Sequence, residues 1–318
     1  MRVCRLFLFL LLLGVLPGMA RGQDRLRLVV WNVENLFDCH DDSLTRDEEF
    51  LPDSPRHWTK ARYWHKLQDV ARVVLAMGHE GPPELVALCE VENDSVMRDL
   101  THRSLLRSLG YRYVLTTGSD LRGINVALLY QPSRFRLLGS RSLPVPSQSG
   151  GHAPTRDVLH AWGTLPGGDT LHLALCHLPS RRGGSKKAQA HRLLAAQVLQ
   201  AVADSLGPQR LLAVAGDFNA PPRDPLFAHL PGLHDLVPRA RRPKIGTYRF
   251  RGEWQWIDHV LVSPALLPRC SAPVLYTAPW MQQPVGKSPD WQPRRTYAGP
   301  HYLGGVSDHV PFYVDISL

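Results

Sequence analysis

Cysteine is scarce in this chain of 318 residues, and its only long apolar run lies near the N-terminus. Of the five cysteines, four follow residue 22: Cys39, Cys89, Cys176 and Cys270. An even number permits disulfides in an exported chain, but Cys89 and Cys176 each lie in an apolar run, where buried free thiols are equally expected. No later stretch is long and apolar enough to span a bilayer, and the lack of repeats and heptads excludes a solenoid or a coiled coil.

The first 22 residues have the composition of a secretory signal peptide. Two arginines precede an apolar run at 6–15, and small residues follow it. The run is too short for a spanning helix, which takes ~20 apolar residues, and Cys4 precedes it, whereas a lipid-anchoring cysteine would follow. A retained anchor is the alternative, because Arg21 is unusual near a cleavage site. We therefore expect residues 23–318 to form a soluble exported protein, periplasmic or extracellular.

The chain is basic. Lys and Arg outnumber Asp and Glu by 37 to 28, which gives a formal net charge of +9. Loss of residues 1–22 removes three arginines and no acid, so the charge falls to +6. This favours anionic partners through long-range attraction but does not identify a substrate, and a solvated basic surface without a partner is the alternative.

Runs rich in Val, Leu and Ile predict short strands, and three longer segments predict helices. We expect helices at about 60–77, 95–109 and 185–206, with Thr59 and Asp94 capping the first two. Few and irregular crossovers favour an α+β sandwich. Residues 276–305 predict a long ordered loop, and the acidic stretch 38–49 a solvated loop, because it lacks the ligand spacing of a calcium loop. The predicted strands are 26–31, 85–89, 124–130, 158–164, 171–177, 211–215, 257–263 and 311–316.

Polar side chains close several of these runs. The tetrapeptide Gly216-Asp217-Phe218-Asn219 directly follows the apolar run 211–215, and Asp and Asn are more easily placed where a strand ends and the chain turns. These motifs run from Asn32 to His309 and must meet if they form one site, so we expect a single domain. The other four are Trp31-Asn32-Val33-Glu34-Asn35, Leu88-Cys89-Glu90, Trp256-Ile257-Asp258-His259 and Ser307-Asp308-His309.

These residue types suit metal-assisted hydrolysis of a phosphate ester, which needs a cation, a base and help for the leaving oxygen. Glu90 and Asn32 are oxygen ligands of the kind that Mg²⁺ takes, with Mn²⁺ or Ca²⁺ as alternatives, and Asp308 could share the metal. His309 could be the base, with Asp258 holding its imidazole.

A second group of residues fits the leaving-group side. His177 ends the run 171–176 and could donate a proton, while Arg156 or Arg182 could grip the phosphate. A hydrogen-bonded structural His and solvated arginines are the alternatives.

Seven segments in order resemble the endonuclease/exonuclease/phosphatase superfamily over nearly the whole chain after residue 22. The resemblance implies a four-layered α/β sandwich, with two mostly antiparallel sheets packed face to face and helices outside. It also implies that Glu90 is the principal metal ligand and that Asp217 and Asn219 orient the nucleophile and the phosphate. The segments are Trp31-Asn32-Val33-Glu34-Asn35, Leu88-Cys89-Glu90, Thr155-Arg156-Asp157, His177-Leu178-Pro179-Ser180, Gly216-Asp217-Phe218-Asn219, Ile257-Asp258-His259 and Ser307-Asp308-His309.

The His in the fourth segment resembles the deoxyribonuclease branch, where this His is the general acid. The chain departs from similar exported bacterial members at Asn125, where an Asp is expected. If that position supports His177, an amide stabilises the imidazolium less well than a carboxylate.

The function expected from these features is that of an exported metal-dependent phosphodiesterase, acting as a monomer on nucleic acid. A phosphatase or phospholipase acting on inositol phosphates or sphingomyelin by the same mechanism is the first alternative. A catalytically silent binding module is the second.

Overall fold

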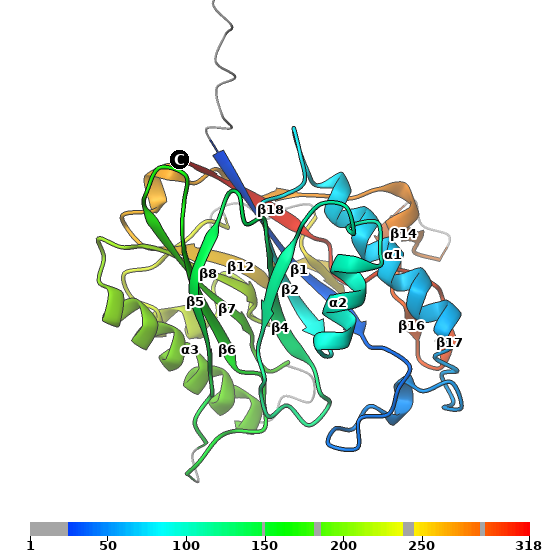
Figure 1. The fold of residues 1–318 in the computed structure, drawn as a ribbon. Helices are drawn as coiled ribbons and strands as arrows, with labels where there is room; N and C mark the ends of the chain where they lie inside the picture. The colour runs from blue at the N-terminus through cyan, green and yellow to red at the C-terminus, as the bar shows by residue number, and fades with distance from the viewer. Residues whose placement is uncertain (1–24, 148–149, 181–185, 238–244, 287–289) are drawn as a thin grey trace, which may run out of the picture.

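The computed structural model describes residues 25–147, 150–180, 186–237, 245–286 and 290–318. The predicted signal peptide and Arg182 lie outside these residues. Two six-stranded sheets form the centre, and helices lie on their outer sides (Figure 1). This is the predicted α+β sandwich of four layers. Within the described residues, no helix combines the length and apolarity needed to cross a membrane.

The first sheet is antiparallel except for one parallel pair, β1 with β2. A parallel pair needs a crossover, and α1 supplies it. The strand order is β13 (Val274–Leu275), β18 (Phe312–Ser317), β1 (Arg25–Leu36), β2 (Leu85–Val91), β4 (Asn125–Tyr130) and β3 (Arg112–Leu115).

The second sheet repeats this plan. Its one parallel pair is β7 with β8, and α3 forms the crossover between them. The strand order is β5 (Arg136–Leu143), β6 (Val158–Thr164), β7 (Thr170–His177), β8 (Leu211–Asp217), β12 (Asp258–Val262) and β9 (His234–Asp235).

Three helices cover the outer faces: α1 (Lys60–Ala76) and α2 (Asp94–His102) on the first sheet, and α3 (Lys186–Leu206) on the second (Figure 1). The Thr59 side chain caps α1 as predicted. The cap of α2 is Asn93 and not Asp94, and this helix ends seven residues earlier than the predicted 109. Ser104 explains the early end, because its hydroxyl donates to the Leu100 carbonyl and accepts from the Leu106 amide, which competes with helical bonding.

Buried side chains form three cores. One lies between the first sheet and α1 with α2, one between the two sheets, and one between the second sheet and α3. The four cysteines of the described chain are free thiols, and Cys89 and Cys176 are buried.

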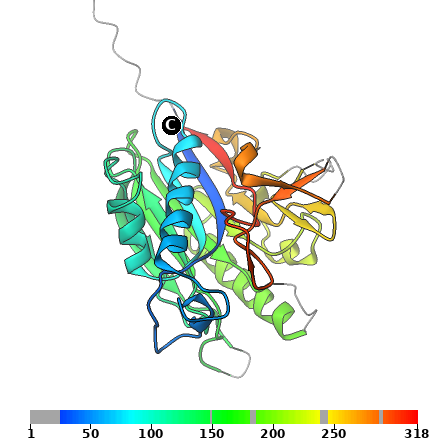
Figure 2. The same ribbon diagram turned by 90° about the vertical axis from the view of Figure 1, so that its right-hand side faces the viewer.

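The segment 276–305 is ordered as predicted, but it contains short strands and a 3-10 turn that the sequence did not predict. Two short hairpins and a 3-10 turn lie in it, and Figure 2 shows the segment beside α1. A third hairpin lies earlier in the chain. The hairpin strands are β10 (Tyr248–Phe250) with β11 (Glu253–Gln255), β14 (Gln282–Pro284) with β15 (Trp291–Pro293), and β16 (Tyr297–Ala298) with β17 (His301–Tyr302).

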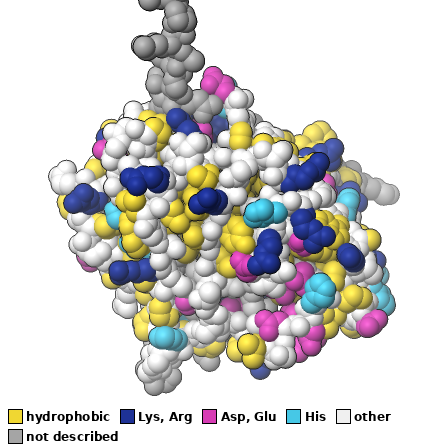
Figure 3. Space-filling model, viewed as in Figure 1, with side chains coloured by type: hydrophobic (Ala, Val, Ile, Leu, Met, Phe, Trp, Pro, Cys, Tyr) yellow, Lys and Arg dark blue, Asp and Glu magenta, His cyan; other side chains and the backbone are white. Residues whose placement is uncertain are grey.

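The acidic stretch 38–49 is only partly the solvated loop that the sequence predicts. Asp41, Asp42 and two glutamates are exposed, whereas Asp38 and Asp47 are buried. Acidic side chains gather over the segment that follows β1, at the lower right of Figure 3. Lys and Arg side chains are more scattered over the same face.

Candidate active site

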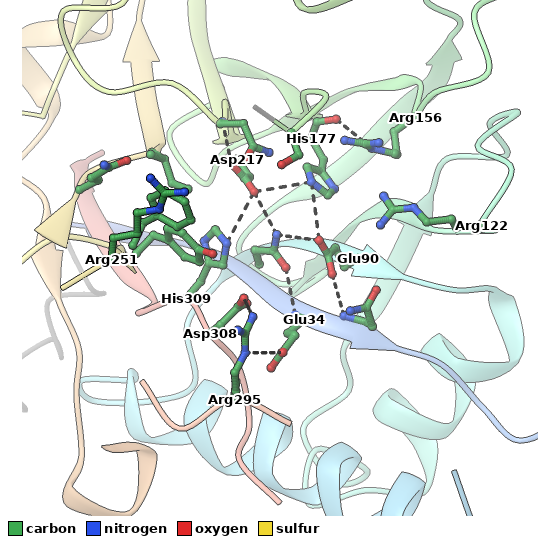
Figure 4. Close-up of a pocket in the computed structure, with 18 residues that line it drawn as sticks. Glu34, Glu90, Arg122, Arg156, His177, Asp217, Arg251, Arg295, Asp308 and His309 are labelled. Atoms are coloured by element: carbon green, nitrogen blue, oxygen red, sulfur yellow. Dashed lines mark hydrogen bonds and ion pairs between the residues drawn. The ribbon is translucent and has the colours of Figure 1, made fainter. Parts of the chain in front are cut away.

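The carboxyl ends of the two parallel strand pairs meet at a cavity of about 610 Å³ (Figure 4). Parallel pairing places the ends of neighbouring strands at the same sheet edge, and the two sheets bring two such edges together. All the predicted site residues of the described chain line this cavity except Asp258, which lies behind His309. Arg182 cannot be placed, because it lies outside the described residues.

Asp217 lies at the centre of the site and is buried. Its Oδ2 accepts a hydrogen bond from the Asn32 amide at 3.0 Å and lies 3.6 Å from His177 Nε2 and 3.8 Å from His309 Nε2. Its Oδ1 accepts from the Asn219 backbone N–H at 2.8 Å. Burial, and next the Asp258 carboxylate opposite it in the sheet, raise the pKa of Asp217 to about 7.

Glu90 faces Asp217 from the other sheet. Its Oε1 accepts from the Asn32 amide at 3.2 Å and its Oε2 from the Asn35 N–H at 2.8 Å. The pairing of β2 with β4 shifts register between Cys89 and Val91, and Glu90 has φ 66. This bulge in a central strand aims the carboxylate into the cavity.

His309 and Asp258 form the predicted pair. His309 Nδ1 donates to Asp258 Oδ2 at 2.9 Å, and both side chains are buried. The Ser307 hydroxyl fixes this turn, because it accepts from the His309 N–H and donates to the Asn32 carbonyl. Burial alone would lower the pKa of His309, but Asp258, and then Asp217, raise it well above its ordinary value. These two carboxylates therefore favour the protonated imidazole, which can donate toward the cavity.

The pKa of His177 is shifted in the opposite direction to that of His309. Burial, and next the Arg156 guanidinium, lower the pKa of His177 well below its ordinary value. Its Nδ1 has no hydrogen-bond partner among the described residues. Asn125 does not support His177, because the Asn125 amide nitrogen donates to the Glu92 and Gly123 carbonyls and its oxygen accepts from residues 116 and 118. These surroundings favour the neutral imidazole of His177, so the predicted general-acid role requires that bound substrate change them.

Arg156, the predicted phosphate arginine that the structure describes, is not a simple phosphate clamp. The Arg156 guanidinium is buried and donates to Asp120 and to the His177 and Leu178 carbonyls. It therefore fixes the end of β7 and offers the cavity only its remaining N–H groups. Arg122, which was not among the predicted site residues, lines the cavity with a side chain that is 49% exposed.

Asp308 belongs to a charged network that sequence reasoning missed. Arg295 donates to Asp308 and lies 3.4 Å from Glu34 Oε1, and the Thr296 N–H donates to Glu34 Oε2 at 2.7 Å. Beneath them, buried Lys66 donates to the Thr296 hydroxyl. Burial, and next Asp308, raise the pKa of Glu34 to about 7. Glu34 could have been found, since it lies two residues after Asn32 in the first motif.

The donor set fits a divalent cation. Glu90, Asp217 and Asp308 bring carboxylate oxygens to one cavity, which is the chemistry that Mg²⁺ prefers. The donor atoms of Asp217, Asp258 and His309 also lie within 4.8 Å of one another. Asn32 differs from expectation, because its oxygen accepts from the Glu34 N–H and its nitrogen faces the carboxylates. In this arrangement Asn32 holds the carboxylates in place, and Glu90 is the better candidate ligand.

Comparison with known proteins gives a consistent result. A family model described as "Endonuclease/Exonuclease/phosphatase family" matches residues 27–318. A search of curated proteins gave no match.

Solved structures share the fold at low sequence identity. Humanized D. rerio TDP2 is 16% identical with a TM-score of 0.61, covering 93% of this chain and 100% of that one. A mannosyl-6-phosphatase from Bacteroides thetaiotaomicron is 17% identical with a TM-score of 0.59, covering 91% and 98%. The catalytic domain of human Nocturnin with bound sulfate is 17% identical with a TM-score of 0.56, covering 92% and 94%. The chain therefore belongs to the endonuclease/exonuclease/phosphatase family of metal-dependent phosphoester hydrolases.

Proposed function

We propose that this chain is an exported, divalent-metal-dependent phosphodiesterase whose substrate is nucleic acid. The observation that carries the proposal is the meeting of the His309–Asp258 pair, Asp217 and Glu90 in one cavity. Each is a residue type that phosphoester hydrolysis requires. Export rests on the composition of residues 1–22 alone.

Each group has a role that follows from its surroundings. Glu90, with Asp308 nearby, would hold the cation, which when bound would neutralise charge on the phosphate oxygens. Asp217 is buried and can accept a proton from an attacking water, while the His309 imidazolium can donate a hydrogen bond to a phosphate oxygen. Asp258 keeps that imidazolium oriented and charged. Asn219 lines the same wall and, by the family resemblance, orients the phosphate.

Two further features favour a polymeric diester over a small monoester. Arg122 and Arg251 lie on opposite sides of the cavity, with Glu90, Asp217 and His309 between them (Figure 4). Positive charge on both sides of the reacting centre suits a substrate that carries phosphates on both sides of the scissile bond. A D. rerio TDP2 structure of this fold holds a single-stranded DNA product, and the mannosyl-6-phosphatase shows that the fold also accommodates a different substrate.

The test is an activity panel on purified residues 23–318. The substrates are single-stranded DNA, plasmid DNA, RNA, methyl p-nitrophenyl phosphate, p-nitrophenyl phosphate, mannose 6-phosphate, inositol phosphates and sphingomyelin, each with Mg²⁺, Mn²⁺ or Ca²⁺ and with excess chelator. We expect hydrolysis of nucleic acid and of the chromogenic diester, lost with chelator. Hydrolysis of monoesters or sphingomyelin alone would contradict a nucleic-acid substrate and support the phosphatase or phospholipase alternative. Inactivity with every metal would favour a binding module.

A further inference from the structure

The hairpin β10–β11 forms one wall of the cavity and is built as a rigid platform. Its turn is Arg251-Gly252, with φ 49 and φ 86, which is the two-residue turn that matches the twist of a hairpin. On its outer face, Arg249 donates to the Trp291 carbonyl at 2.7 Å, and the Trp254 ring contacts the Trp291 ring with centroids 4.8 Å apart. These contacts tie the hairpin to β15.

The inner face of the same hairpin carries aromatic side chains. Tyr248 and Phe250 are two residues apart on β10, so both point to the cavity side, and both line the cavity. The Tyr248 ring lies 4.9 Å from the His309 ring, measured between centroids. Phe250 is the next position outward on this face, about 6.8 Å further along the strand.

Phe250 is the one aromatic residue among the large apolar side chains that are exposed in the described part of the chain. It is 44% exposed although it stands on an anchored strand. The Arg251 guanidinium carbon lies 5.2 Å from the centroid of the Phe250 ring, and Arg251 is itself exposed. The guanidinium thus lies over one face of the ring, and the exposed area of Phe250 is available for a planar partner.

We propose that Phe250 and Arg251 form a nucleobase-binding subsite, in which Phe250 stacks the base attached next to the scissile phosphate and Arg251 contacts the adjoining phosphate. This proposal rests on the proposed function and names the part of the substrate that the hairpin recognises. An aromatic ring stacks any base, because every base has a π-face, so the subsite would select nucleic acid without strong sequence preference. A sugar phosphate or an inositol phosphate has no planar group for this ring.

The experiment compares two single-stranded hexanucleotides of equal charge, one of thymidines and one with abasic tetrahydrofuran in place of every base. Binding is measured by fluorescence anisotropy with excess chelator, so that no cleavage occurs. We expect the wild type to bind the thymidine strand about 5- to 150-fold more tightly, which corresponds to ~1–3 kcal/mol for one stacked base. Phe250→Ala should bring this ratio close to one, and Phe250→Tyr should retain it. The matched control is Leu138→Ala on β5, which truncates a side chain that is 49% exposed and outside the cavity lining, and should keep the wild-type ratio.

Arg251→Ala gives an independent reading, because it removes a charge and no ring. It should weaken binding of both strands by the same factor and flatten the dependence of log affinity on log salt by about 0.7 for single strands. Equal affinity of the wild type for the two strands, or an unchanged ratio in Phe250→Ala, would overturn the subsite.

The proposed function is judged separately, by hydrolysis of methyl p-nitrophenyl phosphate, which has no base. Hydrolysis of that diester with equal affinity for both strands means that the subsite fails and the diesterase stands. If affinity depends on the bases but no diester is hydrolysed, the subsite stands and the proposed diesterase function fails.

Discussion

The hydrogen bond between His309 and Asp258 allows a quantitative test of how the site works. His309→Ala removes the donor that faces the cavity, and loss of one hydrogen-bond donor to the charge that develops in the transition state lowers the rate about 10²- to 10³-fold. Asp258→Asn removes the charge from a buried 2.9 Å bond, and a bond to a charged group contributes ~1.5–3 kcal/mol, or about 10- to 150-fold. Independent effects would multiply to a loss of roughly 10³- to 10⁵-fold. Because Asp258 acts through His309, we expect the double variant to lose about as much as His309→Ala alone.

The assay is kcat/KM for methyl p-nitrophenyl phosphate with saturating Mg²⁺ for the four proteins of this cycle. Asp235 and His259 provide a matched control, since they form another buried His–Asp pair at 2.9 Å that does not line the cavity. Asp235→Asn should lower thermal stability, and its effect should multiply with that of His309→Ala. A multiplicative Asp258→Asn and His309→Ala pair would refute the coupling and place Asp258 on the metal or the substrate.

Three other outcomes are expected. Glu90→Gln should raise the metal concentration needed for half-maximal activity at least tenfold, measured by metal titration against the exposed control Glu80→Gln. Gly216→Ala should abolish soluble folded protein, because Gly216 has φ 139 and an added methyl group would overlap the Cys176 carbonyl oxygen; circular dichroism of a folded variant would contradict this. Burial, and next His172, lower the pKa of His160 to about 4, so the unfolded chain takes up this proton first as pH falls below ~6.5 and stability is lost down to about pH 4. Urea unfolding should show that the free energy of unfolding falls by ~1 kcal/mol less between pH 7.5 and pH 5 in His160→Gln than in the wild type, allowing for partial solvent exposure.

The sequence predicts most of the two central sheets, because a strand that is buried on both faces appears in the sequence as a short continuous apolar run. Runs of Val, Leu and Ile located the buried strands of both sheets, and the polar residues at their ends marked the cavity. The polar ends of neighbouring strands meet at one sheet edge when those strands pair in parallel, and parallel pairing needs a crossover. The helices between residues 36 and 85 and between 177 and 211 provide these crossovers.

The elements that sequence reasoning missed lie where no single periodicity dominates. β3 and β5 are edge strands with exposed Arg and Ser positions, so their apolar alternation is weak. The hairpin β10–β11 has only three residues in each strand, and its function depends on which face meets the cavity. The Asn32 amide nitrogen is oriented by Glu90 and Asp217, which lie 58 and 185 residues further along the chain. Arg295 contacts Glu34 across a separation of 261 residues. No local sequence pattern records contacts at these separations.

The backbone of the site is strained in a way that explains why the cavity is built on central strands. Of the six described residues other than glycine with positive φ, four line the cavity at or just after the ends of β1, β2 and β8: Glu34, Asn35, Glu90 and Asn219. A fifth, Arg251, lies in the hairpin turn, where positive φ is the usual conformation. Each such conformation costs ~1–3 kcal/mol, a large total beside a net folding stability of about 5–15 kcal/mol. A loop would relax out of these conformations. At the ends of β1, β2 and β8, between the three cores, neighbouring strands hold the backbone in place, so the burial of the sheets maintains the positions of the carboxylates.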